Sequence, residues 1–192
     1  MNEAVLILNL ANLALIGTLP KIFFRRGRLN IRWWITAAPF FVAAAALCMG
    51  LSGSLEPFGR SMLAEAASVL ASASSILLIG LTLGTHRVPL SLWHQDDDLP
   101  RRIVTTGPYR RIRHPFYAAF LLALGATAAG FPHWTTLLCA VFGAVQLNRT
   151  AAREEKRLLE SHAGEEYAAY RERTGRFIPR LRRRSAGLTA VG

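Results

Sequence analysis

Long uncharged apolar runs alternate with short charged segments along this chain of 192 residues. Three of these runs, residues 4–20, 33–55 and 66–85, contain no Asp, Glu, Lys or Arg. Each has about the length of a helix that crosses a bilayer core, which takes roughly 20 residues. A fourth uncharged run, residues 115–148, is too long for one span and is interrupted by Gly130-Phe131-Pro132-His133, so it predicts a helical hairpin. The pattern therefore predicts an all-α integral membrane protein with about five transmembrane helices, three followed by a hairpin.

The basic residues are concentrated beside these runs. Five lie between the first two runs, six in residues 87–113 and eleven after Asn148, and Arg60 alone lies on the other side. The positive-inside rule then predicts a multi-pass protein with its N-terminus outside and with residues 86–114 and the C-terminus in the cytoplasm. The chain is 52% hydrophobic with a mean hydropathy of +0.26, yet its net charge is +11. Because these charges flank apolar runs, they indicate a lipid bilayer as partner and no nucleic acid.

Other features predict little further chemistry in the N-terminal half. The start lacks the basic segment of a signal peptide, so none is expected. Cys48 and Cys139 fall inside apolar runs, which disfavours a disulfide, and the five histidines have no ligand-like spacing, so no metal site is expected. The runs rich in Ala, Ser and Gly are typical of close helix–helix contact in lipid. The predicted division is residues 1–85 as three membrane helices, 86–181 as the region with the candidate chemistry, and 182–192 as a basic tail on anionic lipid headgroups.

The segment GPYRRIRHPFY, residues 107–117, precedes the hairpin. Pro115 suits the first turn of a helix and holds His114 outside the helical conformation. The turn expected at Gly107-Pro108 brings Tyr109 back beside His114. We expect a cup lined by a helix N-terminus, an imidazole, the phenols of Tyr109 and Tyr117, and guanidinium groups. Arg110 and Arg111 are interpreted as positive-inside anchors.

A carboxylate is predicted to face this cup from the helix that follows the fifth span. On helical spacing, its apolar face is formed by Ala151, Ala152, Leu158 and Leu159, and Glu155 lies at the centre of that face. A carboxylate in this setting needs either a cationic ligand or a salt bridge to an arginine of the 101–113 loop, and both remain open. Glu154, at the edge of the face, is expected to be solvated. We expect this helix to reach His162, and a second short helix to follow it and stop near Gly175.

Three motifs stand out in the C-terminal half: TTGPYRRIRHPFY, the EEKRL of residues 154–158, and GEEYAAYRERTGRFIP. Together they resemble the isoprenylcysteine carboxyl methyltransferase family, whose members are integral membrane enzymes related to phospholipid methyltransferases. The resemblance covers roughly residues 80–180, in the family's order and spacing. It implies that residues 86–181 are a catalytic region binding S-adenosylmethionine on the cytoplasmic side of a cell membrane of bacterial or archaeal type. The cofactor contacts that the resemblance implies are His94, Ile103, Val104, Tyr109, His114, Pro115, Phe116, Tyr117 and Glu155.

The chain departs from the family at the position expected to orient the substrate. The family has an arginine about one turn before its cofactor-binding glutamate, whereas this chain has Ala151 there, which leaves Arg149 and Arg153 as candidates. The resemblance implies a lipophilic small molecule or a prenylated substrate as methyl acceptor. Other readings remain open: an NADPH-dependent membrane reductase with a related C-terminal region, a non-catalytic membrane binding protein, and a small channel or transporter.

Overall fold

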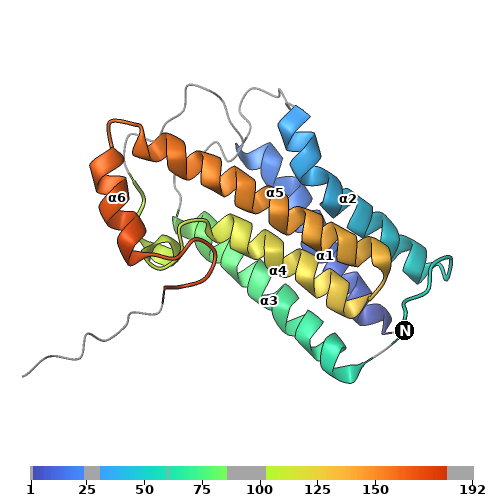
Figure 1. Ribbon diagram of the computed structural model, residues 1–192. Helices are drawn as coiled ribbons and strands as arrows, with labels where there is room; N and C mark the ends of the chain where they lie inside the picture. The colour runs from blue at the N-terminus through green and yellow to red at the C-terminus, as the bar shows by residue number, and fades with distance from the viewer. Residues whose placement is uncertain (1, 24–30, 60, 86–102, 181–192) are drawn as a thin grey trace, which may run out of the picture.

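The computed structural model describes residues 2–23, 31–59, 61–85 and 103–180. Five long helices lie side by side, and two short ones gather at one end of the bundle (Figure 1). The elements are α1 (Glu3–Phe23), α2 (Ile31–Leu51), α3 (Met62–Thr85), η1 (Gly107–Arg110), α4 (Pro115–Gly130), α5 (Trp134–Leu159) and α6 (Gly164–Arg173). Among these described residues the one β-type pairing is an isolated parallel bridge between Ile112 and Gly175. The all-α prediction and the predicted hairpin are thus confirmed.

Some boundaries differ from those predicted. The second helix ends at Leu51, before a turn in which Gly53 has φ of 74°. The third begins at Met62 and takes Glu65 into its first turn, where the helix dipole favours an acidic side chain. The helix that follows the hairpin turn ends at Leu159, three residues before His162. The positions of the turns were therefore predicted more closely than the ends of the helices.

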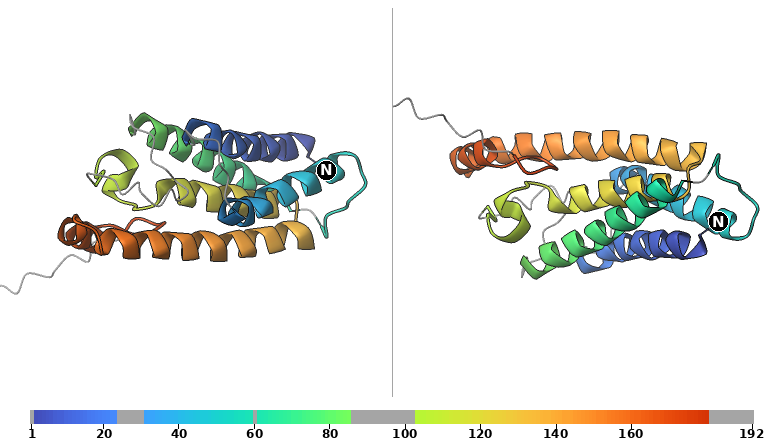
Figure 2. Two further views of the ribbon diagram at one scale, coloured as in Figure 1. Left: turned by 90° about the horizontal axis from the view of Figure 1, so that it is seen from above. Right: turned by 90° about the horizontal axis from the view of Figure 1, so that it is seen from below.

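Helix α4 is the most enclosed element of the bundle and packs against α1, α3 and α5 (Figure 2). Its buried side chains combine aromatic residues such as Phe116 and Phe120 with alanines such as Ala119 and Ala123. Small residues allow close approach of neighbouring helices, and the aromatic rings fill the remaining space. This packing fixes the position of the N-terminus of α4, where the candidate site begins.

Buried polar side chains join α1, α3 and α4. Asn9 Nδ2 donates to Ser68 Oγ at 2.9 Å, and Ser72 Oγ donates to Asn9 Oδ1 at 2.5 Å. Ser68 Oγ in turn donates to the carbonyl oxygen of Ala126 in α4 at 2.7 Å, and Ser75 Oγ lies 2.8 Å from that of Ala119. The serines that the sequence assigns to helix packing therefore also form hydrogen bonds between helices.

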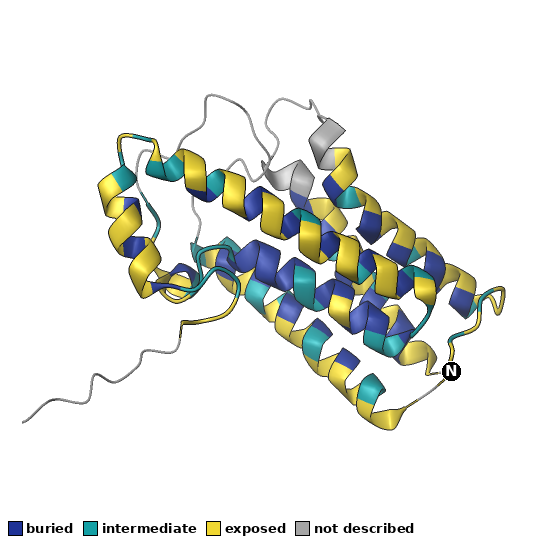
Figure 3. Ribbon diagram, viewed as in Figure 1, coloured by how far each residue is buried: buried dark blue, intermediate teal, exposed yellow. Residues whose placement is uncertain are grey.

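Large apolar side chains cover much of the outer surface of α2, α3 and α5, where exposed stretches face away from the bundle (Figure 3). Among the described residues, the segments Trp34–Leu51 and Met62–Thr85 are long and apolar enough to cross a membrane. Helices α1 and α4 contain the shorter apolar stretches Glu3–Leu19 and Pro115–Gly130. Helix α5 is apolar in its first half and becomes charged from Arg149 onward.

The two ends of the bundle differ. At one end the loop after α2 meets the hairpin turn, where Phe58 N donates to the carbonyl oxygen of Pro132 at 2.9 Å and the Phe58 ring stacks on His133. At the other end α4 begins and α5 ends, next to η1 and α6 (Figure 1). The described parts of the two charged segments, residues 103–114 and 149–180, therefore meet at this second end.

Candidate functional site

Three segments far apart in the sequence form the site: residues 109–117, the second half of α5, and α6 with residues 174–177. After α5 the chain turns at residues 160–163, and α6 brings it back beside η1 (Figure 1). Arg113 N donates to the carbonyl oxygen of Gly175 at 2.8 Å, and His114 N donates to that of Arg176 at 3.1 Å. Tyr170 Oη donates to the carbonyl oxygen of Tyr109 at 2.7 Å. The C-terminal segment is thereby fixed to the chain just before α4.

The predicted turn at Gly107-Pro108 is present as η1. Gly107 has φ of +56°, and a Cβ at this position would collide with the Thr85 side chain at the end of α3. Glycine is therefore required both for the backbone conformation and for the close approach to α3. The turn buries Tyr109, and burial raises the pKa of its phenol well above the ordinary value. Tyr109 is consequently neutral and available only for packing and hydrogen bonding.

His114 lies between two carboxylates. It immediately precedes α4 with φ of −123° and ψ of 67°, outside the helical region, as Pro115 predicts. Its Nδ1 is 3.5 Å from Glu154 Oε2, its Nε2 is 3.3 Å from Glu155 Oε1, and its ring stacks on Tyr117 with centroids 5.3 Å apart. Burial lowers the pKa of the imidazole against the opposing pull of Glu155, so His114 is neutral at pH 7.

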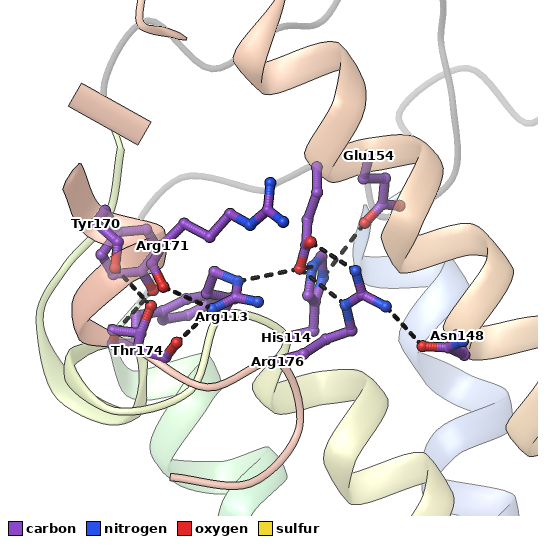
Figure 4. Close-up of polar contacts among 10 residues, drawn as sticks. Arg113, His114, Asn148, Glu154, Tyr170, Arg171, Thr174 and Arg176 are labelled. Atoms are coloured by element: carbon purple, nitrogen blue, oxygen red, sulfur yellow. Dashed lines mark hydrogen bonds and ion pairs between the residues drawn. The ribbon is translucent and has the colours of Figure 1, made fainter. Parts of the chain in front are cut away.

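Glu155 is buried at the centre of the site, with 3% of its side chain exposed. Arg113 Nε donates to Oε1 at 3.0 Å, and Arg176 donates to both carboxylate oxygens, at 3.0 Å through Nε and 2.7 Å through Nη2 (Figure 4). Burial alone would raise the pKa of Glu155, but the neighbouring His114, Arg176 and Arg113 hold it well below its ordinary value. Of the two alternatives left open by the sequence, the salt bridge to an arginine of the 101–113 loop is therefore present. We call Glu155, Arg113, Arg176 and His114 the Glu155 cluster.

The two arginines of this cluster also bind other groups. Arg113 Nη1 donates to the carbonyl oxygens of Arg171, at 3.2 Å, and Thr174, which lie at the end of α6. A cation at the C-terminus of a helix is favoured by the unpaired carbonyl groups and by the dipole. Arg176 Nη1 donates to Asn148 Oδ1 at 2.7 Å, so this guanidinium spans two turns of α5 between Asn148 and Glu155.

Glu154 is not solvated as expected. Tyr117 Oη donates to Glu154 Oε1 at 2.6 Å, and 24% of the glutamate side chain is exposed. Burial raises the pKa of Glu154 to about 7, although Tyr117, Arg153 and Arg157 pull it down. The prediction was wrong because it considered only the position of Glu154 on its own helix. The N-terminus of α4 covers that position with Tyr117.

The remaining candidate residues differ in how far they are buried. Ile103 and Val104 are half-buried in the segment that leads to η1, and Pro115, Phe116 and Tyr117 are buried in the first turn of α4. Phe116 and Tyr117 belong to the apolar core, so Phe116 is covered by other side chains. Arg149 and Arg153 are exposed, and Arg153 Nη2 donates to Thr150 Oγ1 at 3.3 Å. His94 and the basic tail lie outside the described residues.

Arg176 was missed by the sequence reading. It belongs to the segment TGRFIP that follows α6, and no local pattern relates it to Glu155. The available signal was the helix break near residues 160–163 together with the short length of α6, which allow the chain to return to the start of α4. With Arg113, Arg176 and Glu155 charged and His114 neutral, the Glu155 cluster has a net charge of +1. It can bind an anion at its guanidinium groups, while Glu154 can bind a cation.

Within the part of the chain that the structure describes, no three His, Cys, Asp or Glu side chains are grouped so as to hold a metal ion. Neither a scan against protein-family models nor a search of curated proteins gives a match to this chain.

Proposed function

We propose that the protein is an integral membrane methyltransferase that uses S-adenosylmethionine and acts on a lipophilic or amphipathic acceptor. The observation that carries the proposal is the meeting of Glu154, Glu155, His114 and two arginines at one end of a helical bundle with an apolar exterior. The motifs that resemble the isoprenylcysteine carboxyl methyltransferase family supply all three segments of this site. Arg113, Arg176 and Glu155 fall within those motifs, although the resemblance itself does not pair them.

The membrane location is supported by the surface of the bundle. Leu70, Leu77 and Leu81 of α3 are each more than half exposed, as are Leu138 and Val141 of α5. Apolar patches of this kind are rare on proteins that are surrounded by water. Among the described residues, the basic side chains of η1, the second half of α5 and α6 lie at the end that carries the site, which favours a cytoplasmic site and an external N-terminus.

Cysteine labelling tests this topology. In a background with Cys48→Ala and Cys139→Ala, Ser54→Cys should react with a membrane-impermeant maleimide added to intact cells, and Thr106→Cys should react only after lysis. Both positions are exposed, at opposite ends of the bundle. The reverse pattern would overturn the orientation, and equal labelling of both in intact cells would contradict a membrane-spanning fold.

The residues of the site fit S-adenosylmethionine in kind. Glu154 suits a cationic group of this cofactor, its ammonium or its sulfonium, and the guanidinium groups of Arg113 and Arg176 suit its carboxylate. His114 Nε2 is buried without a hydrogen bond of good geometry, 3.3 Å from Glu155 Oε1. Ile103 and Val104 offer half-buried apolar surface in the segment that leads to η1. When bound, the cofactor supplies an electrophilic methyl group.

The protein's own part is to align the reactants and exclude water. Methyl transfer is an in-line displacement, so positioning and a dry environment are the main contributions that a protein can make. Pro115 and the packed first turn of α4 hold His114 and Tyr117 in place, and the amides of Arg113 and His114 bind the segment after α6 to the site. Because the site lies at the end of an apolar bundle, a lipophilic acceptor can reach it from the bilayer and the cofactor from the cytosol.

Calorimetry on the purified protein in detergent tests the proposal. S-adenosylmethionine and S-adenosylhomocysteine should both bind, and His114→Ala should weaken binding at least about tenfold, as expected for loss of one buried polar contact. Glu160→Gln, at the exposed end of α5, is the matched control and should bind normally. Binding of NADPH in place of these two ligands would favour the reductase. If neither S-adenosylmethionine nor S-adenosylhomocysteine binds at millimolar concentration, the methyltransferase proposal is contradicted and a non-catalytic membrane protein is favoured.

A further inference from the structure

Glu154 forms a second polar group beside the Glu155 cluster. Its Oε1 accepts the phenol hydrogen of Tyr117, and its Oε2 lies 3.5 Å from His114 Nδ1. Oε2 thus faces His114, just before α4 (Figure 4). Oε1 faces Tyr117, within the first turn of α4. A quarter of the side chain remains exposed, which leaves a path for a proton between Glu154 and water.

The charged and titratable groups that surround Glu154 come from four elements. They are His114 and Tyr117 at the start of α4, Tyr109 of η1, Arg153, Glu155 and Arg157 of α5, and Tyr167 of α6. Burial raises the pKa of the Tyr109 and Tyr167 phenols, so both are neutral. Tyr117 is also neutral, since it donates its phenol hydrogen to Glu154. Arginines remain charged at all relevant pH values. This leaves His114, Glu154 and Glu155 as the groups that can exchange a proton near neutral pH.

Two of these three groups are unsuited to exchange a proton near neutral pH. Glu155 accepts three hydrogen bonds from guanidinium groups, which hold it ionised. Burial disfavours the charged form of His114. A neutral imidazole carries only one N–H for the two carboxylates that lie beside its ring nitrogens. A protonated Glu154 can donate its hydrogen to the other nitrogen, so one proton on Glu154 satisfies both side chains. The proton of the site therefore belongs on Glu154.

We propose that Glu154 is the proton acceptor of this site and that the methyl acceptor is an amine or a hydroxyl, not a carboxylate. The inference rests on the proposed methyltransferase function. Methylation of an X–H group breaks the carbon–sulfur bond of the donor and forms an X–C bond, and the proton on X must leave. Glu154 Oε takes that proton and returns it to water through its exposed edge. A carboxylate acceptor is already ionised and has no proton to give, so it would leave this arrangement without a role.

Ligand charge provides a way to observe Glu154 directly. Because the pKa of Glu154 is about 7, about half of the molecules carry its proton at pH 7 before a ligand binds. A cationic sulfonium beside the carboxylate favours the ionised form, so binding should release that proton. Binding thus also prepares Glu154 to act as a base.

Calorimetry in two buffers of different ionisation enthalpy measures this release. At pH 7, S-adenosylmethionine should release about half a proton per molecule bound, and S-adenosylhomocysteine, which lacks the sulfonium charge, should release less. Glu154→Gln should bind with no release, and the control Glu160→Gln should behave as the wild type. Binding without proton release in the wild type, or equal release in Glu154→Gln, would overturn the role of Glu154. Absence of binding would instead contradict the methyltransferase function.

Transfer of a labelled methyl group to simple lipophilic probes tests the acceptor class. Dodecylamine and dodecanol offer an X–H group on a C12 chain, and dodecanoate offers a carboxylate on a chain of the same length. We expect methylation of at least one of the first two, with a rate that rises with pH through about 7 in the wild type and falls at least about 100-fold in Glu154→Gln. Methylation of dodecanoate alone, with the same rate in Glu154→Gln, would overturn the proposal.

Discussion

Substitution of Glu155 by glutamine tests whether the Glu155 cluster holds the C-terminal segment in place. The change preserves the size of the side chain and removes its charge, which leaves Arg113 and Arg176 without their shared partner. Loss of one partner of a buried ion pair costs about 3–5 kcal/mol. Arg113 is 9% exposed but Arg176 is 31% exposed, so solvent screens part of the interaction and the lower figure, about 3 kcal/mol, applies.

The loss of local stability should appear where residues 111–114 pair with residues 174–176. The amides of Arg113, His114 and Gly175 donate across this pairing. A cost of about 3 kcal/mol corresponds to roughly 100-fold faster opening, since about 1.4 kcal/mol is a factor of ten. Hydrogen–deuterium exchange followed by mass spectrometry on the ligand-free protein should detect this acceleration in both peptides. Glu160→Gln, whose side chain is 63% exposed, should leave the exchange unchanged.

An acceleration below about fivefold in Glu155→Gln would refute the reasoning. It would mean that Tyr170 and the backbone pairing hold the segment without the cluster. In that case Glu155 would be available to a cationic ligand, which is the other alternative that the sequence leaves open.

Three further substitutions have predictable effects on stability. Because burial raises the pKa of Glu154, the folded state binds more protons than the unfolded state between about pH 4.5 and pH 7, and stability from this group falls as pH rises. Ligand-free Glu154→Gln should therefore be more stable than the wild type at pH 8, by on the order of 2–3 kcal/mol. Thermal melting should show this difference shrinking toward pH 4.5, and a difference independent of pH would contradict the raised pKa of Glu154. Gly107→Ala should lower the free energy of unfolding by at least about 1–2 kcal/mol, because Gly107 has a positive φ and lies against α3. The control Gly125→Ala lies in open space on α4 and should not destabilise the protein, so equal effects of the two changes in thermal melting would contradict this prediction. Asn9→Leu removes two hydrogen bonds to serines of α3 and should lower stability by about 1–2 kcal/mol, and an unchanged melting temperature would show that these bonds contribute nothing.

The features that the sequence predicted well depend on local chemistry. The apolar runs located the long helices, and Gly130 to His133 located the hairpin turn. Pro115 determined the conformation of His114 because proline restricts the residue before it. Helical spacing placed Glu155 on the buried face of α5, where its side chain is 3% exposed.

The features that could not be predicted from the sequence depend on contacts between distant segments. Arg176 reaches Glu155 only because α6 returns the chain to the start of α4, and helical periodicity carries no information on such a return. Glu154 was assigned to solvent because its own helix leaves it at the edge of an apolar face, but Tyr117 of α4 covers it. The serines of α3 were recognised as small packing residues, and their hydrogen bonds to Asn9 of α1 became evident only from the packed bundle.

Photochemical labelling with S-adenosylmethionine tests the central proposal most directly, because it reports both the ligand and its location. The purified protein is irradiated with cofactor labelled in the methionine part, with and without excess S-adenosylhomocysteine, and the labelled peptides are identified. We predict that the label is displaced by the competitor and lies in residues 103–117 or 148–177, and that His114→Ala reduces it. Label confined to residues 1–85, or label that the competitor does not displace, would contradict a methyl-donor site at the Glu155 cluster.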